Sequence, residues 1–495
     1  MAVKVDTQKE IIFGSSDPNI SRVISKKKKD GELRKLAPRI YTTNLIDSPA
    51  NIVRRNLIEI LAYRYPNALI SHRSAKEMRP TSTGDFFLTN STTRRVTDLP
   101  GIILNFVKGP KATAHDIPFM GMHISGEHRY MLENMQLSRK SGDESRVLPI
   151  SVIENKLEQL LLTGGEERLN QYRDELREVA NELGMADEFS KINNIISALL
   201  STHDARVLST DSAKARASGN PFDANRVGLF EILFDTIKDR YFVIRNNRNT
   251  DEDSFRLFSF FESYFSNYIE GTEFDIEEAK EIVDSGIPMP RRDEDSHDIL
   301  GTFKILSNRT EMRRVPTSPE ELFAILSHRH TILLEGRPHM NPGVFKMRNN
   351  RAGQTEFVDY QLVKGTLSQG FKYYSALTDP FARAIFMMFM ISEVHPFNDG
   401  NGRIARVMMN AEFVRADQSR IIVPTVFRED YILALRKLTR HKDPMAYINV
   451  MTKLHQFSDN LYGTDFTELK NYLAACNAYE EPSQAKLQII DRTIQ

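Results

Sequence analysis

The residues best suited to chemistry lie together in a short glycine-rich stretch in the last quarter of the chain. His395 comes first, and Asp399, Arg403 and Arg406 follow within twelve residues. His395 is the only group of this stretch able to accept a proton near pH 7, so it is the candidate general base. A carboxylate such as Asp399 suits Mg²⁺, and two arginines three residues apart suit a diphosphate or triphosphate. The stretch therefore predicts attack of an activated hydroxyl on a nucleotide phosphate.

The residues between these side chains favour a phosphate-binding turn. Gly400 and Gly402 flank Asn401, and glycines let backbone N–H groups turn toward a ligand. A helix that begins at about Gly402 would add unpaired N–H donors and the positive end of its dipole. A lone glycine-rich loop is usually only a turn, but this joint pattern is hard to obtain by chance. We therefore expect an anion site at the start of the helix.

The run of residues 395–406, HPFNDGNGRIAR, resembles the complete signature of the Fic family. Members of that family typically transfer AMP from ATP to Ser, Thr or Tyr hydroxyls of proteins. The resemblance covers residues 226–455 and implies a helical Fic bundle with a β-hairpin flap. It also implies that ATP is the substrate, that His395 deprotonates the target hydroxyl and that Asp399 holds Mg²⁺.

The same resemblance assigns the rest of the signature to phosphate binding. The nucleotide-binding residues that it implies are Phe397, Asp399, Gly400, Asn401, Gly402, Arg403 and Arg406. The glycines and the asparagine would line an anion hole, and the two arginines would contact the β- and γ-phosphates. The phenylalanine would anchor the loop in the hydrophobic core. Together with His395, the asparagine and both arginines form the catalytic set that we expect.

A second pattern lies upstream, at residues 266–271, SNYIEG. Ser266, Glu270 and Gly271 match the family's inhibitory pattern Ser/Thr-x-x-x-Glu-Gly/Asn. A carboxylate delivered by a neighbouring helix can pair with Arg406 and deny that arginine to the γ-phosphate. Because Glu followed by Gly also commonly ends a helix, the alternative is a plain helix C-terminus. Beside the intact signature we favour autoinhibition.

The sequence between the later helices favours a short hairpin. FKMRNN and TEFVDY flank residues 351–353, which predicts a hairpin within 345–365 that projects from a helical body. The resemblance implies that this hairpin is the flap that holds a target segment by strand addition. Upstream, His328, His330 and His339 lack nearby cysteine or carboxylate ligands, so we expect surface or capping histidines rather than a metal site.

The composition excludes several classes of protein. The 66 Lys and Arg balance 66 Asp and Glu, so a uniformly basic or acidic protein is excluded. The single cysteine, Cys476, excludes an intrachain disulfide and a Cys-rich zinc site. The longest apolar run, residues 384–391, is far shorter than the roughly 20 residues that cross a bilayer. We therefore expect a soluble, cytoplasmic protein.

The region near the start of the chain has a basic character. Residues 22–39 carry a net charge of +6, which indicates a solvated, mobile tail or, alternatively, an electrostatic arm for nucleic acid. Helix-like segments and strand-like pieces at 86–88, 94–97 and 102–107 then outline a winged helix, with a net charge of +5 over residues 54–108. Through its ISHRSA stretch this segment bears a weak resemblance to AbiEi-type winged-helix antitoxins.

These patterns together predict a mainly α protein in which a winged-helix-like α+β domain precedes the Fic bundle. The expected organisation is a basic flexible arm at 1–40, a winged-helix-like domain at 41–135, a helical region at 136–207, a linker at 208–225, the Fic domain with its inhibitory helix at 226–455 and a helical C-terminal tail at 456–495.

The leading hypothesis for function is a protein adenylyltransferase held inactive by Glu270. One alternative is a hydrolase that removes AMP from proteins, with Glu270 positioning the attacking water. Another is a DNA-binding regulator whose Fic domain senses nucleotide, and UTP or GTP could replace ATP because nothing in the loop reads the base. Candidate partners are a protein with a hydroxyl side chain, the chain itself as target, DNA at the N-terminal region and a second copy of the chain. No membrane partner is expected.

Overall fold

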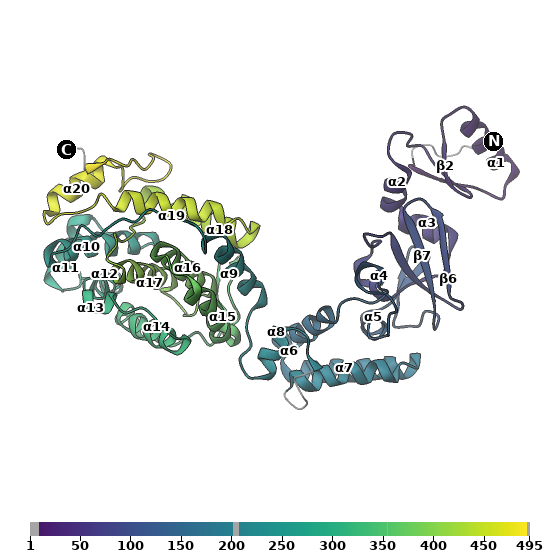
Figure 1. Cartoon of the computed structure of the whole chain (residues 1–495), viewed down its shortest axis with the longest axis horizontal. Coiled ribbons are helices and arrows are strands. Elements are labelled where there is room, and N and C mark those ends of the chain that lie inside the picture. Colours follow the sequence, from purple (N-terminus) through teal and green to yellow (C-terminus); the bar gives the residue numbers. More distant parts are fainter. Residues whose placement is uncertain (1–8, 201–206, 354, 493–495) are drawn as a thin grey trace. The chain divides into compact units, whose positions relative to one another are not determined.

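The computed structural model describes residues 9–200, 207–353 and 355–492. The chain is mainly helical and divides into two compact units, residues 1–218 and 219–495. Figure 1 shows the elements of both units. The division falls inside the range expected to be a linker, but that range also contains helix α8 (Asp211–Ala217), which begins where Thr210 accepts a hydrogen bond from the N–H of Ala213.

The first elements of the chain form a small sheet. Strands β1 (Ile11–Phe13), β3 (Ile40–Thr42) and β2 (Arg34–Ala37) pair antiparallel in that order, and helix α1 (Pro18–Lys29) connects the first to the second along the chain. The lysines predicted to be mobile lie in the last turn of α1, where they complement the negative end of the helix dipole. Within the described residues 9–40, the prediction of a flexible arm is therefore corrected, because this segment has a buried apolar cluster of its own.

The next elements form a six-stranded mixed sheet with helices beside it. Its strand order is β6-β7-β5-β4-β9-β8, and β5 and β7 pair in parallel. The expected strands near residues 86, 94 and 102 are present as β5, β6 and β7 of this sheet. The elements of this region are α2 (Pro49–Arg55), α3 (Leu57–Arg64), β4 (Leu69–Ile70), α4 (His72–Glu77), β5 (Asp85–Asn90), β6 (Arg94–Leu99), β7 (Ile102–Lys108), β8 (Ile117–Phe119), β9 (Met122–Ile124) and α5 (Glu127–Glu133).

Two long helices follow the sheet, in the region predicted to be helical. Helix α6 (Ile150–Leu183) is interrupted at Gly165, whose φ of 68° lies outside the helical range. After this interruption the residues that step by three or four along the sequence, from Leu169 to Leu183, are buried in one apolar cluster with those of α7 (Ala186–Leu199). This apolar stripe therefore packs one helix on the other.

The second unit is built around helices α16 and α17, which lie at its middle in Figure 1. Helix α16 is buried almost along its whole length, as its nearly uninterrupted apolar sequence predicts. The helices of this unit are α9 (Ala224–Ile237), α10 (Glu252–Ile269), α11 (Ile276–Ser285), α12 (Asp293–Leu306), α13 (Arg309–Met312), α14 (Pro319–Leu333), α15 (Val363–Ala376), α16 (Pro380–Val394), α17 (Asn401–Arg415), α18 (Arg428–His441), α19 (Pro444–Ser458) and α20 (Phe466–Ala475). Across the described residues, no helix is long and apolar enough to span a membrane.

Two further features complete this unit. The predicted hairpin is present as β10 (Arg351–Ala352) and β11 (Thr355–Glu356), which pair antiparallel. The C-terminal tail is helical only in part, because the chain after α20 continues mostly without regular structure through residue 492. That last segment is held by hydrogen bonds such as the one that Tyr472 donates to the carbonyl of Ile490.

Candidate functional site

The glycine-rich stretch forms a tight loop between two buried helices. We call residues 395–400 the signature loop. His395 caps the end of α16 with a left-handed φ of 50°, and Gly400, with φ of 70°, precedes the first residue of α17. The helix thus begins one residue earlier than predicted. Because the first N–H groups of a helix have no acceptor within it, the start of α17 offers donors to an anion.

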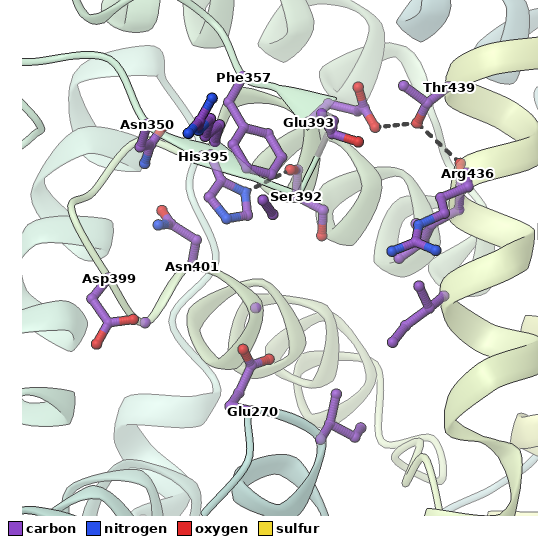
Figure 2. Close-up of a pocket in the computed structure, with 18 of the residues that line it drawn as sticks. Glu270, Asn350, Phe357, Ser392, Glu393, His395, Asp399, Asn401, Arg436 and Thr439 are labelled. Carbon is purple, nitrogen blue, oxygen red and sulfur yellow. Dashed lines mark hydrogen bonds between the residues drawn. The ribbon is translucent and has the colours of Figure 1, made fainter. Parts of the chain in front are cut away.

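The signature loop borders a cavity of about 410 Å³. Figure 2 shows His395, Asp399, Asn401 and Glu270 around this space. Its remaining walls come from the end of α16, from α18, from the hairpin segment and from Gly402 and Arg406 of α17. The loop predicted to bind phosphate, the predicted base and the predicted inhibitory carboxylate therefore border the same space.

His395 is held in a defined state. Its Nδ1 lies 2.9 Å from the carbonyl oxygen of Ser392, and since a carbonyl can only accept, Nδ1 carries the proton. The ring stacks on Phe357, with ring centroids 3.5 Å apart. Burial lowers the pKa of His395 to about 4, so the imidazole is neutral at pH 7. Its Nε2 then carries a lone pair that can accept a proton.

Arg406 is buried and contacts the upstream pattern. Its Nε donates to Ser266 Oγ at 2.9 Å, and its Nη2 donates to the Ser266 carbonyl at 2.8 Å and to Glu270 Oε1 at 2.7 Å. Burial raises the pKa of Glu270, but the attraction of Arg406 outweighs it and leaves the pKa below its usual value. A Cβ at Gly402 would lie 2.2 Å from Glu270 Oε1, so the carboxylate sits directly against the start of α17. Gly271 follows α10 with φ of 93°, which favours glycine.

Arg403 does not line the cavity, contrary to the expectation that both arginines face a phosphate. It is buried, and its Nη1 pairs with Asp298 Oδ2 at 2.8 Å and donates to Asn267 at 3.3 Å. Sequence spacing places two arginines near one another but does not reveal that α12 supplies a carboxylate to one of them. Arg403 Nε, however, is buried without a hydrogen-bond partner among the described residues, which leaves one donor unused.

The comparison with known families agrees with this geometry. The model of the Fic/DOC family matches residues 318–412, a range that includes the whole signature loop and the start of α17. Residues 318–412 of this chain therefore match a Fic/DOC domain. The matched range also contains α14, the hairpin and α16, so the Fic domain includes most of the elements that border the cavity.

Curated relatives and solved structures carry Fic names. Protein adenylyltransferase fic-1 of Caenorhabditis elegans is 30% identical over 115 residues, which are 23% of this chain and 22% of that protein. Protein adenylyltransferase Fic of Nematostella vectensis is 24% identical over 214 residues, 40% of this chain and 47% of that protein. The chain thus spans less than half the length of these two relatives. A solved structure of Fic-1, residues 134–508, from C. elegans is 17% identical with a TM-score of 0.36, and covers 66% of this chain and 92% of that one.

Asp399 of the Fic domain fits the chemistry expected of a magnesium ligand. Its side chain is 40% exposed and borders the cavity, with Arg403 Nη2 3.8 Å from its Oδ2. The described residues contain no cluster of three or more metal-ligating side chains. A Mg²⁺ ion at this carboxylate would therefore take most of its ligands from nucleotide phosphates and water, as Mg²⁺ commonly does.

Phe397, a residue of the signature loop, packs its ring on His330 of α14. Phe397 is fully buried, and His330 stacks on it with ring centroids 3.7 Å apart. The expectation that His330 is a surface or capping residue is wrong, because its side chain has no exposed surface, whereas His328 is half exposed. The missed signal was the apolar face of α14, since His330 follows Leu326 by four residues and precedes Leu333 by three.

Proposed function

We propose that this Fic protein transfers AMP from ATP to a Ser, Thr or Tyr hydroxyl of a target protein. The observation that carries the proposal is that a neutral His395 shares one cavity with the N-terminus of α17 and with Arg406. A base that is unprotonated at pH 7 can activate a hydroxyl, and a helix N-terminus with a buried arginine can hold phosphates.

In this mechanism the hydroxyl oxygen attacks the α-phosphorus of ATP. A bond forms between that oxygen and phosphorus, the bond from phosphorus to the bridging oxygen of the β-phosphate breaks, and diphosphate leaves. The hydroxyl proton passes to Nε2 of His395, whose Nδ1–H remains bonded to the Ser392 carbonyl. Mg²⁺ at Asp399, when bound, supplies positive charge that offsets the charge of the leaving diphosphate.

Glu270 keeps this site in an inhibited state. Its Oε1 accepts from Arg406 Nη2 and lies against the backbone of Gly402. The γ-phosphate of ATP would need the same guanidinium and the same space. ATP can then bind only with its phosphates displaced from the productive position, and the target hydroxyl cannot attack in line.

The decisive experiment compares AMP transfer by wild-type protein and by Glu270→Gly, with ATP labelled on the α-phosphate and Mg²⁺. We expect strong labelling of the protein itself or of a lysate protein only in the variant. The matched control is Glu270→Gly with His395→Ala, which keeps the vacated space but lacks the base and should give no label. Transfer that is absent from Glu270→Gly, or equal with and without His395, would contradict the proposal.

A second candidate function is removal of AMP from a modified protein. It is favoured by the partial exposure of the Glu270 side chain, 34%, toward the cavity, where a carboxylate could orient a water. The two functions predict opposite effects of Glu270→Gly: the variant gains transfer if Glu270 inhibits, and loses hydrolysis if Glu270 positions water. Incubating an AMP-modified target with each protein and following release of AMP distinguishes them.

A further inference from the structure

Carbonyl groups at the end of α16 and in the signature loop are held by one neighbouring segment, residues 330–350. Four hydrogen bonds reach the backbone of residues 394–399 from this segment: Lys346 Nζ to Val394 O at 3.3 Å, Lys346 N to Pro396 O at 2.8 Å, Asn350 Nδ2 to Phe397 O at 2.9 Å and His330 Nε2 to Asp399 O at 3.0 Å. Backbone carbonyls fixed in this way fix the peptide planes to which they belong.

His330 occupies the end of this set nearest the proposed phosphate site. The N–H of Gly343 donates to its Nδ1 at 2.8 Å, so Nδ1 is unprotonated and the proton of the neutral ring lies on Nε2. The Nε2–H of His330 donates to the carbonyl of Asp399. Both nitrogens of the imidazole therefore make hydrogen bonds, and one face of the ring stacks on Phe397.

The hydrogen bond from His330 fixes the orientation of the peptide between Asp399 and Gly400. This peptide carries the N–H of Gly400 and adjoins the carboxylate of Asp399. In a trans peptide the carbonyl and the following N–H point in opposite directions. Because the Asp399 oxygen points to His330, the N–H of Gly400 points away from it, and Gly400 borders the cavity. The carboxylate of Asp399 belongs to the same residue, and Arg403 Nη2 lies 3.8 Å from its Oδ2. One donor thus controls both the start of the anion site and the backbone that carries the carboxylate.

We infer that His330 is a positioning residue, whose Nε2–H orients the Asp399–Gly400 peptide so that its carboxylate and N–H can receive metal-bound nucleotide phosphates. The inference rests on the proposed function, since it concerns the phosphate end of the same site. His330 itself touches neither the cavity nor the transferred group.

Two substitutions separate the two nitrogens of His330. In His330→Gln the side-chain amide reaches the position of Nε2 and can still donate to Asp399, but the acceptor for Gly343 is lost. In His330→Asn the amide oxygen replaces Nδ1 and can still accept from Gly343, but the donor to Asp399 is lost. Both variants lose the ring that stacks on Phe397, so their melting temperatures should fall by similar amounts.

The test measures ATP binding by titration calorimetry, with Mg²⁺ and separately with EDTA, in protein that carries Glu270→Gly. We expect His330→Asn to bind ATP with Mg²⁺ at least about tenfold more weakly, the usual effect of losing a group that orients a metal ligand. His330→Gln should stay within about threefold of the parent, and the gap between the two variants should narrow in EDTA. His328→Asn, on the exposed side of the same helix, is the control and should leave affinity unchanged.

Equal weakening by His330→Gln and His330→Asn, or none by either, would overturn the inference, since a merely structural role does not distinguish the nitrogens. Failure of the proposed function has another signature. In that case Glu270→Gly protein binds ATP, and responds to the His330 variants as expected, but transfers no AMP.

Discussion

Arg406 is a buried cation, and in the proposed function a phosphate of ATP replaces Glu270 as its partner. Its guanidinium donates to Ser266 and Glu270, and a buried charge that loses a partner destabilises the fold. We therefore expect Glu270→Gly to lower the free energy of unfolding of the empty protein by about 1–3 kcal/mol, less than for a fully buried pair because Glu270 is partly exposed. ATP should then raise the melting temperature of the variant more than that of the wild type, since phosphate replaces the missing carboxylate. Thermal unfolding with and without ATP measures this, and equal shifts would argue against exchange at Arg406.

His395 should act on the chemical step and not on binding. Its Nδ1 and ring face are used by Ser392 and Phe357, so only Nε2 remains for a proton. In Glu270→Gly protein, the further change His395→Ala should lower the rate of transfer by at least about a hundredfold, while the dissociation constant for ATP changes less than about threefold. Rates from labelled ATP and affinities from calorimetry measure the two quantities. A parallel loss of affinity would instead place His395 in nucleotide binding.

Buried histidines make the stability of the second unit depend on pH. Burial lowers the pKa of His455 to about 4 from 6.5, as it does for His395, and its Nε2 donates to the Ser419 carbonyl. The nearest charged groups, Arg245 and Asp459, oppose each other in their effects on this pKa. Between pH 6.5 and pH 4 the unfolded chain binds protons that the folded chain excludes, so stability is full above pH 6.5 and falls as pH drops.

We expect about 2 kcal/mol of stability to be lost per such histidine between pH 7 and pH 5. Urea unfolding at the two pH values measures the loss. In His455→Gln the wild-type loss should shrink by about the share of one histidine, even though the variant is less stable at both values. An unchanged difference between pH 7 and pH 5 would show that His455 does not contribute.

At the level of elements, the helices around the signature loop could be predicted because their signals are local. Helix α16 begins with Asp379 as its cap and Pro380 at its first turn, continues as a nearly unbroken apolar run, and ends where His395 and Pro396 stop it. Each of these features is visible within the segment itself. The short hairpin of β10 and β11 is similarly local, because its two strands are close neighbours along the chain.

Features that depend on distant residues could not be predicted. The parallel pairing of β5 with β7 could not be predicted from turn residues, because turn residues indicate only that strands adjacent in the sequence pair with each other. Arg403 pairs with Asp298, which lies more than a hundred residues away, so its spacing from Arg406 did not reveal its direction. The basic run at residues 26–29 by itself indicates a solvated tail. It does not reveal the small core beneath α1, because the buried residues of that core come from before, within and after the helix.

Helix α10, which carries Glu270 at its end, is packed against the last segment of the chain. The ring of Tyr479 stacks on Phe265 with centroids 5.4 Å apart, and Tyr268 donates to Glu481 at 2.8 Å. We expect Tyr479→Ala to lower stability by about 2–3 kcal/mol through loss of aromatic packing, and to raise basal AMP transfer because α10 is held less firmly. Tyr268→Phe is the control, since it removes only an exposed hydrogen bond and should change stability by less than about 0.5 kcal/mol. Tyr479→Ala with wild-type basal transfer would show that this packing does not restrain Glu270.

At the scale of the whole molecule, each unit has a hydrophobic core of its own. In the unit of residues 1–218, Phe86 of the sheet is fully buried in an apolar cluster with residues of α2 and α3. In the unit of residues 219–495, Phe389 of α16 is fully buried near Phe230 and Tyr447. Because each unit has its own core, we expect the two units to unfold separately.

Binding of DNA by the first unit stays a prediction from its basic sequence.

We therefore expect calorimetry of the full chain to show two unfolding transitions. Phe86→Ala should lower only one of them and Phe389→Ala only the other, each by about 3–5 kcal/mol in the free energy of unfolding. ATP with Mg²⁺, added to Glu270→Gly protein, should raise only the transition that Phe389→Ala lowers, because a ligand stabilises the unit to which it binds. If either phenylalanine variant moved both transitions, or if the chain unfolded in a single step that ATP raised as a whole, the two cores would be energetically coupled, and nucleotide binding at the Fic domain would then act on the stability of the N-terminal unit.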